Sequence, residues 1–124
     1  MFHMLSCFNL KPGIDIDVFH RLYAEFVETM REAGLVESSG PVGRRQNDTP
    51  MDTDDERDHE FFSVMTFKDR PQVDAAYAYL TERSEPAQSA HFGIFRWVEK
   101  PVFICWQDLP ETPSQIQARN AEMT

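Results

Sequence analysis

The apolar residues in the first third of the chain are spaced as in a strand followed by a helix. Residues 2–10, FHMLSCFNL, are rich in apolar and aromatic side chains and end at the turn sequence KPG, which is typical of a strand. From Ile16 to Ala33, apolar residues recur at steps of three and four, which predicts a helix of about five turns. Asp15 is placed to cap the start of this helix and Gly34 to end it.

The middle of the chain predicts a strand hairpin with a long loop. Residues 41–46 are short and polar, as an edge strand often is. Residues 59–67, HEFFSVMTF, form a much stronger strand pattern. We expect the acidic residues between these two segments to form a solvated loop.

The last third predicts two helices and a final strand. Asp69 can cap a helix. Its apolar stripe consists of Val73, Ala76, Tyr77 and Leu80. Residues 87–98 predict a third, short helix that ends at Pro101. The last strand, VFICWQ, is then expected over residues 102–107.

The order of these elements is the βαββαβ arrangement of ferredoxin-like folds. We therefore expect an α+β domain over residues 1–109 with an antiparallel four-stranded sheet, and a polar tail over residues 110–124. The strands at 59–67 and 102–107 are apolar on both faces, yet helices can cover only one face of such a sheet. The uncovered face predicts a homodimer in which two copies pack sheet to sheet about a two-fold axis, with the tail across the dimer.

This element order and the two-sided apolar strands FFSVMTF and VFICWQ resemble the dimeric α/β-barrel superfamily over residues 2–109. The chain is most similar to the small bacterial members of unknown function. Other members include cofactor-free monooxygenases that act on polyphenols, haem-degrading or haem-binding enzymes, and stress-responsive proteins. The resemblance implies a space between sheet and helices that holds a substrate, but a fold alone transfers no activity.

The charge of the chain argues against several classes of partner. The 124 residues carry a net charge of -9, and residues 48–60 alone contain seven acidic residues and one arginine. We expect no nucleic-acid binding and no attachment to an anionic membrane surface, because both require a basic face. No apolar run reaches the roughly 18 residues of a membrane-spanning helix.

The sequence contains no motif for a cofactor, and we expect none. It lacks a P-loop, a GxGxxG turn, a GxSxG elbow and the histidine or cysteine spacing of a zinc site. The acidic residues 48–60 do not fit the calcium-binding pattern of an EF-hand. Cys7 and Cys105 are too few for a disulfide scaffold and are expected to be buried thiols on neighbouring strands. The first residues do not form a signal peptide, so we expect a cytoplasmic protein.

Two histidines are candidates for general acid–base chemistry. His91 lies on an apolar helix and His3 in a strand with apolar neighbours, and a histidine titrates near neutral pH. The structural alternative is that each is a hydrogen-bonded residue of the core, because a catalytic role also requires a partner within reach.

Five further residues are candidates for binding a substrate. They are Asn9, Trp97, Trp106, Tyr77 and Arg45. The aromatic side chains suit a planar ligand, and we expect Asn9, His91, Trp97 and Trp106 to share one cleft. The structural alternatives are a core or dimer interface for the aromatic residues, and ion pairs with the surplus acids for Arg45.

Three functions are consistent with these residues. The first is binding of a small planar or aromatic molecule between sheet and helices. The second is a cofactor-independent monooxygenase-like enzyme acting on a polyphenol or haem-like substrate, and the third is an interaction module without a ligand. A pocket between sheet and helices that contains an unpaired polar group would favour the first two over the third.

Overall fold

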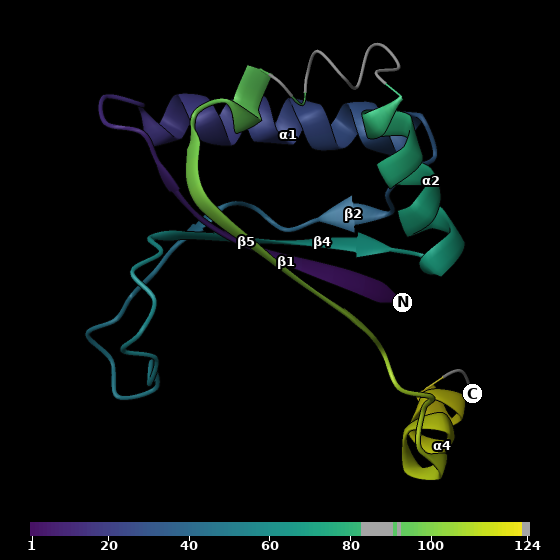
Figure 1. Cartoon of the computed structure of the whole chain (residues 1–124). Helices are drawn as coiled ribbons and strands as arrows, with labels where there is room; N and C mark the ends of the chain where they lie inside the picture. The colour runs from purple at the N-terminus through teal and green to yellow at the C-terminus, as the bar shows by residue number, and fades with distance from the viewer. Residues whose placement is uncertain (83–90, 92, 123–124) are drawn as a thin grey trace.

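The computed structural model describes residues 1–82, 91 and 93–122 of the chain, and its central feature is one antiparallel sheet with helices on one face (Figure 1). The sheet has the order β2-β4-β1-β5, and β3 also pairs with β4. This order confirms the ferredoxin-like α+β fold. The elements are β1 (Phe2–Leu10), α1 (Ile16–Glu32), β2 (Ser38–Ser39), β3 (Gly43–Arg44), β4 (Phe61–Phe67), α2 (Arg70–Thr81), β5 (Val98–Gln107) and α4 (Pro113–Glu122).

Helix α1 forms as its periodicity predicts. The Asp15 carboxylate accepts a hydrogen bond from the Asp17 amide at 2.8 Å, and Gly34 follows the helix with a φ of 74° that favours glycine. The buried side of α1 consists of Phe19, Tyr23, Phe26 and Met30. These side chains pack against the even-numbered residues of β1 and the odd-numbered residues of β4, which make up the core with them.

The second strand differs from the prediction because it is split in two. β2 lies before residues 41–46, and β3 covers only Gly43 and Arg44. Pro41 lies between the two pieces and has no amide hydrogen to donate to β4, so it interrupts the pairing. Both pieces still pair with the same strand, β4, so the position predicted for this edge of the sheet is confirmed.

The last strand begins earlier than predicted. β5 starts at Val98, so Pro101 lies inside the strand and does not end a helix. An edge strand tolerates proline, because its missing amide hydrogen can face away from the neighbouring strand. Lys100 has a left-handed φ of 51°, and the pairing register with β1 shifts beside it. Of the third helix predicted over residues 87–98, residues 87–90 and 92 lie outside the described residues. In its described part, residues 91 and 93–95 are helical and Val98 already belongs to β5.

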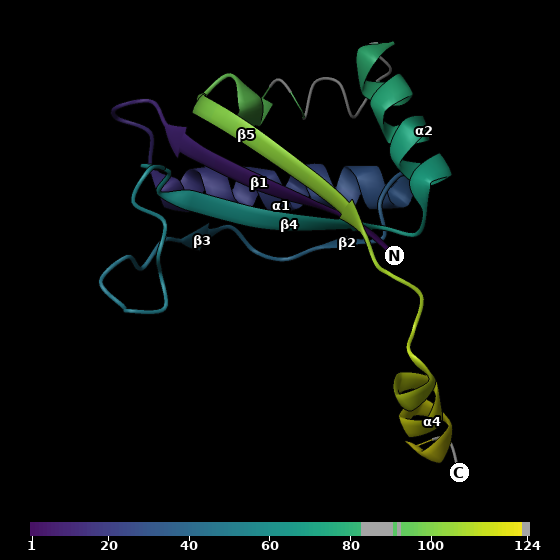
Figure 2. The ribbon, with the colours of Figure 1, turned by 60° about the horizontal axis from the view of Figure 1, so that its bottom comes forward.

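The polar tail forms a helix that was not predicted. Thr112 and Gln115 cap the start of α4. The side chain of each residue accepts a hydrogen bond from the backbone amide of the other. No residue of α4 is buried, and the helix lies apart from the sheet (Figures 1 and 2). Its packing across a dimer stays a prediction.

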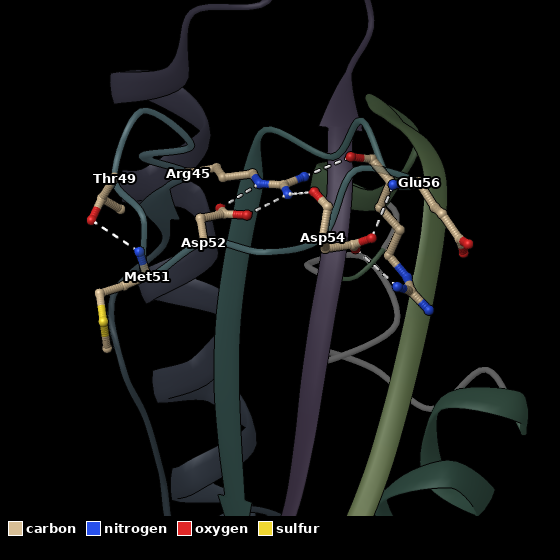
Figure 3. Close-up of polar contacts among 7 residues, drawn as sticks. Arg45, Thr49, Met51, Asp52, Asp54 and Glu56 are labelled. Atoms are coloured by element: carbon tan, nitrogen blue, oxygen red, sulfur yellow. Dashed lines mark hydrogen bonds and ion pairs between the residues drawn. The ribbon is translucent and has the colours of Figure 1, made fainter.

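Arg45 organises the acidic loop between β3 and β4 (Figure 3). Its guanidinium donates two hydrogen bonds of 2.8 Å to the Asp52 carboxylate, and others to the carbonyl oxygens of Asp54 and Arg57. The hydrogen bond from Arg45 lowers the pKa of Asp52 below its usual value. Arg45 therefore pairs with the surplus acids, which is the structural alternative to a ligand-binding role.

We predict that Arg45→Ala loosens this loop. The substitution leaves the Asp52 carboxylate and two carbonyl oxygens without their donor, so limited proteolysis should cut the loop several-fold faster than in the parent protein. Because the pKa of Asp52 is lowered in the fold, acid should accelerate cleavage of the parent loop once the pH falls through that pKa.

The control is Arg57→Ala. Within the described residues, the Arg57 side chain makes one ion pair, an exposed one with Asp54, so its loss should change cleavage little. Equal cleavage rates for Arg45→Ala and the parent protein would show that the loop does not depend on Arg45.

Candidate functional site

A cavity of about 300 Å³ lies between the helix-side face of the sheet and helices α1 and α2. Its wall is mostly aromatic and aliphatic, and none of its described lining residues is an aspartate, glutamate, lysine or arginine. The aromatic members are Tyr23, Phe26, Phe67, Tyr77, Phe95 and Phe103, and the methionines are Met4, Met30 and Met65. Such a wall suits an uncharged, largely apolar molecule, because a charge placed there would lose its hydration without gaining a partner.

The cavity exists because α2 contributes little bulk to the core. Ala76 is the one residue that α2 buries, and it lines the cavity together with Val73 and Leu80. Tyr77 was predicted to belong to the apolar stripe of α2, but its side chain is 71% exposed. One helical step of about 100° separates Tyr77 from Ala76, which turns the tyrosine from the core to the rim of the cavity.

Few polar groups reach this space. The Tyr23 hydroxyl lies 2.8 Å from the hydroxyl of Ser39 and is therefore already paired. Ser6 lines the cavity, and Ser63 lies directly across from it in the register of β1 and β4. The Ser63 hydroxyl is buried and has no hydrogen-bond partner within the described part of the chain. None of these residues was predicted from the sequence to belong to a site. A serine among phenylalanine and methionine at alternate strand positions is nevertheless a pattern that indicates Ser6 and Ser63.

His91 contributes an imidazole to the cavity wall. Its ring stacks on Phe95 with 4.5 Å between centroids and lies 5.7 Å from the ring of Phe26. Burial lowers the pKa of His91 below its usual value, so the ring is neutral at pH 7. Of the seven predicted site residues, His91 and Tyr77 are the two that line the cavity.

His3 and Trp106 lie on the opposite face of the sheet, away from the cavity. Their rings are 5.1 Å apart. The His3 Nδ1 atom lies 3.1 Å from the Thr66 hydroxyl, and its Nε2 atom lies 2.9 Å from a carboxylate oxygen of Asp108. His3 lowers the pKa of Asp108 below its usual value. This cluster joins the first strand to the end of the last one.

Asn9 and Trp97 are also outside the cavity, so the expected cleft shared by Asn9, His91, Trp97 and Trp106 is wrong. The Asn9 side chain accepts a hydrogen bond from the Glu60 amide at 2.7 Å and thereby holds the end of the acidic loop. The guanidinium carbon of Arg96 lies over the ring of Trp97, 4.4 Å from the centroid of that ring. Successive residues of a strand point to opposite faces, which separates the odd-numbered Asn9 from the cavity floor.

The two cysteines do not approach each other as expected. Cys7 lies across from Val102, whereas Cys105 lies across from Met4, three positions away and on the other face. Cys7 is buried, and burial raises the pKa of its thiol. The prediction that both thiols are buried is wrong for Cys105, which is exposed on the edge strand.

The described residues contain neither a group of metal ligands nor a membrane-spanning helix. Among residues 1–82, 91 and 93–122, no three histidine, cysteine or acidic side chains are grouped so that they could hold a metal ion. In the same part of the chain, no helix is long and apolar enough to cross a membrane.

Comparison with known proteins gives a likeness of fold. No protein-family model and no curated protein sequence matches the chain. A protein from Arabidopsis thaliana has a similar structure, with a TM-score of 0.68 at 9% identity over 90% of this chain and 99% of that one. A cofactor-independent oxygenase from Streptomyces nogalater is similar with a TM-score of 0.62 at 8% identity, over 90% of this chain and 96% of the oxygenase.

A third similar structure is a dimeric protein of unknown function from Bacteroides fragilis. It is described as having a ferredoxin-like fold, and its TM-score is 0.53 at 12% identity over 86% of this chain and 95% of that one. At these identities the likeness establishes the fold, and any activity must be argued from the cavity.

We predict that the partial burial of His91 makes stability depend on pH. Because the pKa of His91 is lower in the folded than in the unfolded chain, the unfolded state takes up a proton first as the pH falls. The stability that follows from this difference is fully present above about pH 6.5, the pKa of a histidine in the unfolded chain. It is lost as the pH falls below that value. In urea denaturation, His91→Leu should lose less free energy of unfolding between pH 7 and pH 5 than the parent protein.

His20→Leu is the control, since it leaves the cavity histidine in place and should keep the parent's decrease. An equal decrease in the His91→Leu and parent proteins would show that His91 does not titrate between those pH values.

Proposed function

We propose that this ferredoxin-like protein binds a small, uncharged planar or aromatic molecule in the cavity between its sheet and helices. The observation that carries the proposal is an apolar cavity beside a buried hydroxyl, that of Ser63, which lacks a partner within the described residues. A cavity of about 300 Å³ is at the small end of ligand sites and suits a molecule of one or two rings. His91 and Tyr77 would contact this ligand from the helical side.

A second candidate function is that of a cofactor-independent monooxygenase-like enzyme. The fold is similar to that of the oxygenase from Streptomyces nogalater, and the neutral imidazole of His91 has the protonation state that a general base requires. In this proposal His91 would accept a proton from a polyphenol-like substrate. His3 fits a catalytic role less well, because it lies on the other face and is hydrogen-bonded there.

We further propose that the protein is a homodimer formed through the open face of its sheet. This face carries exposed apolar side chains on β4 and β5, and within the described residues no helix covers it (Figure 2). Val64, Ile104 and Trp106 are 37%, 44% and 43% exposed. The similar structure from Bacteroides fragilis is described as dimeric, which supports the same arrangement here. A cytoplasmic location stays a prediction from the sequence.

The cavity proposal can be tested with a bulky substitution. Val73→Trp places a large ring in the cavity, so it should weaken binding of 2-naphthol, an uncharged two-ring probe, by at least about tenfold. Intrinsic and probe fluorescence would give the dissociation constants.

The matched control is Val18→Trp, which places the same ring on the exposed side of α1 and should leave the affinity unchanged. Equal weakening in both variants, or in neither, would argue against the cavity as the binding site.

The dimer proposal can be tested with a charge on the open face. Val64→Arg should convert the dimer to a monomer, because it would bury two uncompensated cations, one from each copy, in the proposed interface. Light scattering coupled to size exclusion would report the mass.

Val18→Arg adds the same charge to an exposed position of α1 and should leave the dimer intact. A parent protein that is monomeric at micromolar concentration would rule out the proposed dimer.

A further inference from the structure

Two serines face each other on the helix-covered face of the sheet: Ser6, which lines the cavity, and its neighbour Ser63, which is buried beside it. Ser6 on β1 and Ser63 on β4 are direct partners in the antiparallel register, so their side chains lie on the same face of the two central strands. That face is the helix-covered one, because Ser6 lines the cavity. Both residues are more than nine-tenths buried.

The surroundings of this pair are apolar. Along β1 the same face carries Met4 and Phe8, and along β4 it carries Phe61 and Met65. A hydroxyl in such a place loses its hydration, and without a hydrogen-bond partner it destabilises the fold. Alanine would fill nearly the same space without that penalty, so packing alone does not explain serine at both positions.

Within the described part of the chain, the fold does not use the Ser63 hydroxyl. It is buried and accepts or donates no hydrogen bond within the described residues. The hydroxyls of Tyr23 and Ser39, at another part of the cavity, are by contrast paired with each other. Buried polar groups without a partner are uncommon in folded proteins and call for an explanation, such as a bound molecule that completes the hydrogen bond.

We infer that Ser6 and Ser63 together anchor one uncharged oxygen atom of the ligand, a carbonyl or hydroxyl oxygen, at the floor of the cavity. This inference rests on the proposed binding function and adds the chemical class of the ligand. Each serine hydroxyl can rotate to donate to or accept from that oxygen, and the ring of the ligand then contacts the aromatic wall. A carboxylate is disfavoured, because no described lining residue is cationic.

The test compares two probes that differ by a single hydroxyl group. The parent protein should bind 2-naphthol roughly five- to tenfold more tightly than naphthalene, the ratio expected for one or two net hydrogen bonds. In Ser6→Ala and Ser63→Ala this ratio should fall toward one, while the affinity for naphthalene stays unchanged. Ser38→Ala, on exposed strand β2, is the matched control and should keep the parent's ratio.

The outcomes separate this inference from the binding proposal. Tight binding of both probes with a ratio near one in the parent, or an unchanged ratio in both alanine variants, would overturn the anchor and leave the binding site. Failure of both probes to bind saturably would overturn the binding proposal and the anchor with it.

Thermal unfolding gives a second readout. Ser63→Ala should unfold at the same or a higher temperature than the parent, because it removes a buried hydroxyl that has no partner among the described residues. A clearly lower temperature would show that the hydroxyl serves the fold and would overturn the anchor.

Discussion

The structure depends on a sheet that is apolar on both faces and has helices for only one of them. On β4, the odd-numbered residues from Phe61 to Phe67 are buried under the helices, while Phe62 and Val64 point the other way. Because strand side chains alternate, a single strand serves two environments. The buried face contains the core and the cavity, and the open face leaves an apolar surface, which is the proposed dimer interface.

The same alternation sorts the polar groups into two sets. Ser6 and Ser63 lie on the cavity side, whereas His3 and its partner Asp108 lie on the open side. The first set includes a hydroxyl, that of Ser63, without a partner among the described residues, and the second set has hydrogen bonds that satisfy both ring nitrogens of His3. The face on which a polar residue of this sheet lies thus separates the residues of the proposed ligand site from those that make structural hydrogen bonds.

Local patterns explain why the fold was predictable and the site only in part. The helix from Ile16, the strands at β1 and β4 and the order of elements follow from periodicity and capping, which are local properties. The start of β5 and the exposure of Cys105 depend on pairing with a distant strand at the sheet edge, and the sequence does not contain that register. His91 and Tyr77, which line the cavity, were candidates because their side chains are titratable or aromatic. Ser6 and Ser63 come together only once β1 and β4 pair.

The cavity and the open face are therefore the two sides of the same single-layer sheet. Ser63 and Val64 are neighbours in the chain, yet one belongs to the proposed ligand site and the other to the proposed dimer interface. A ligand under the helices and a partner on the open face would contact opposite faces of β1 and β4. Each proposed site can therefore be occupied while the other is occupied too. Binding and dimerisation are consequently compatible in one molecule, and substitutions at adjacent positions of β4 can address each of them separately.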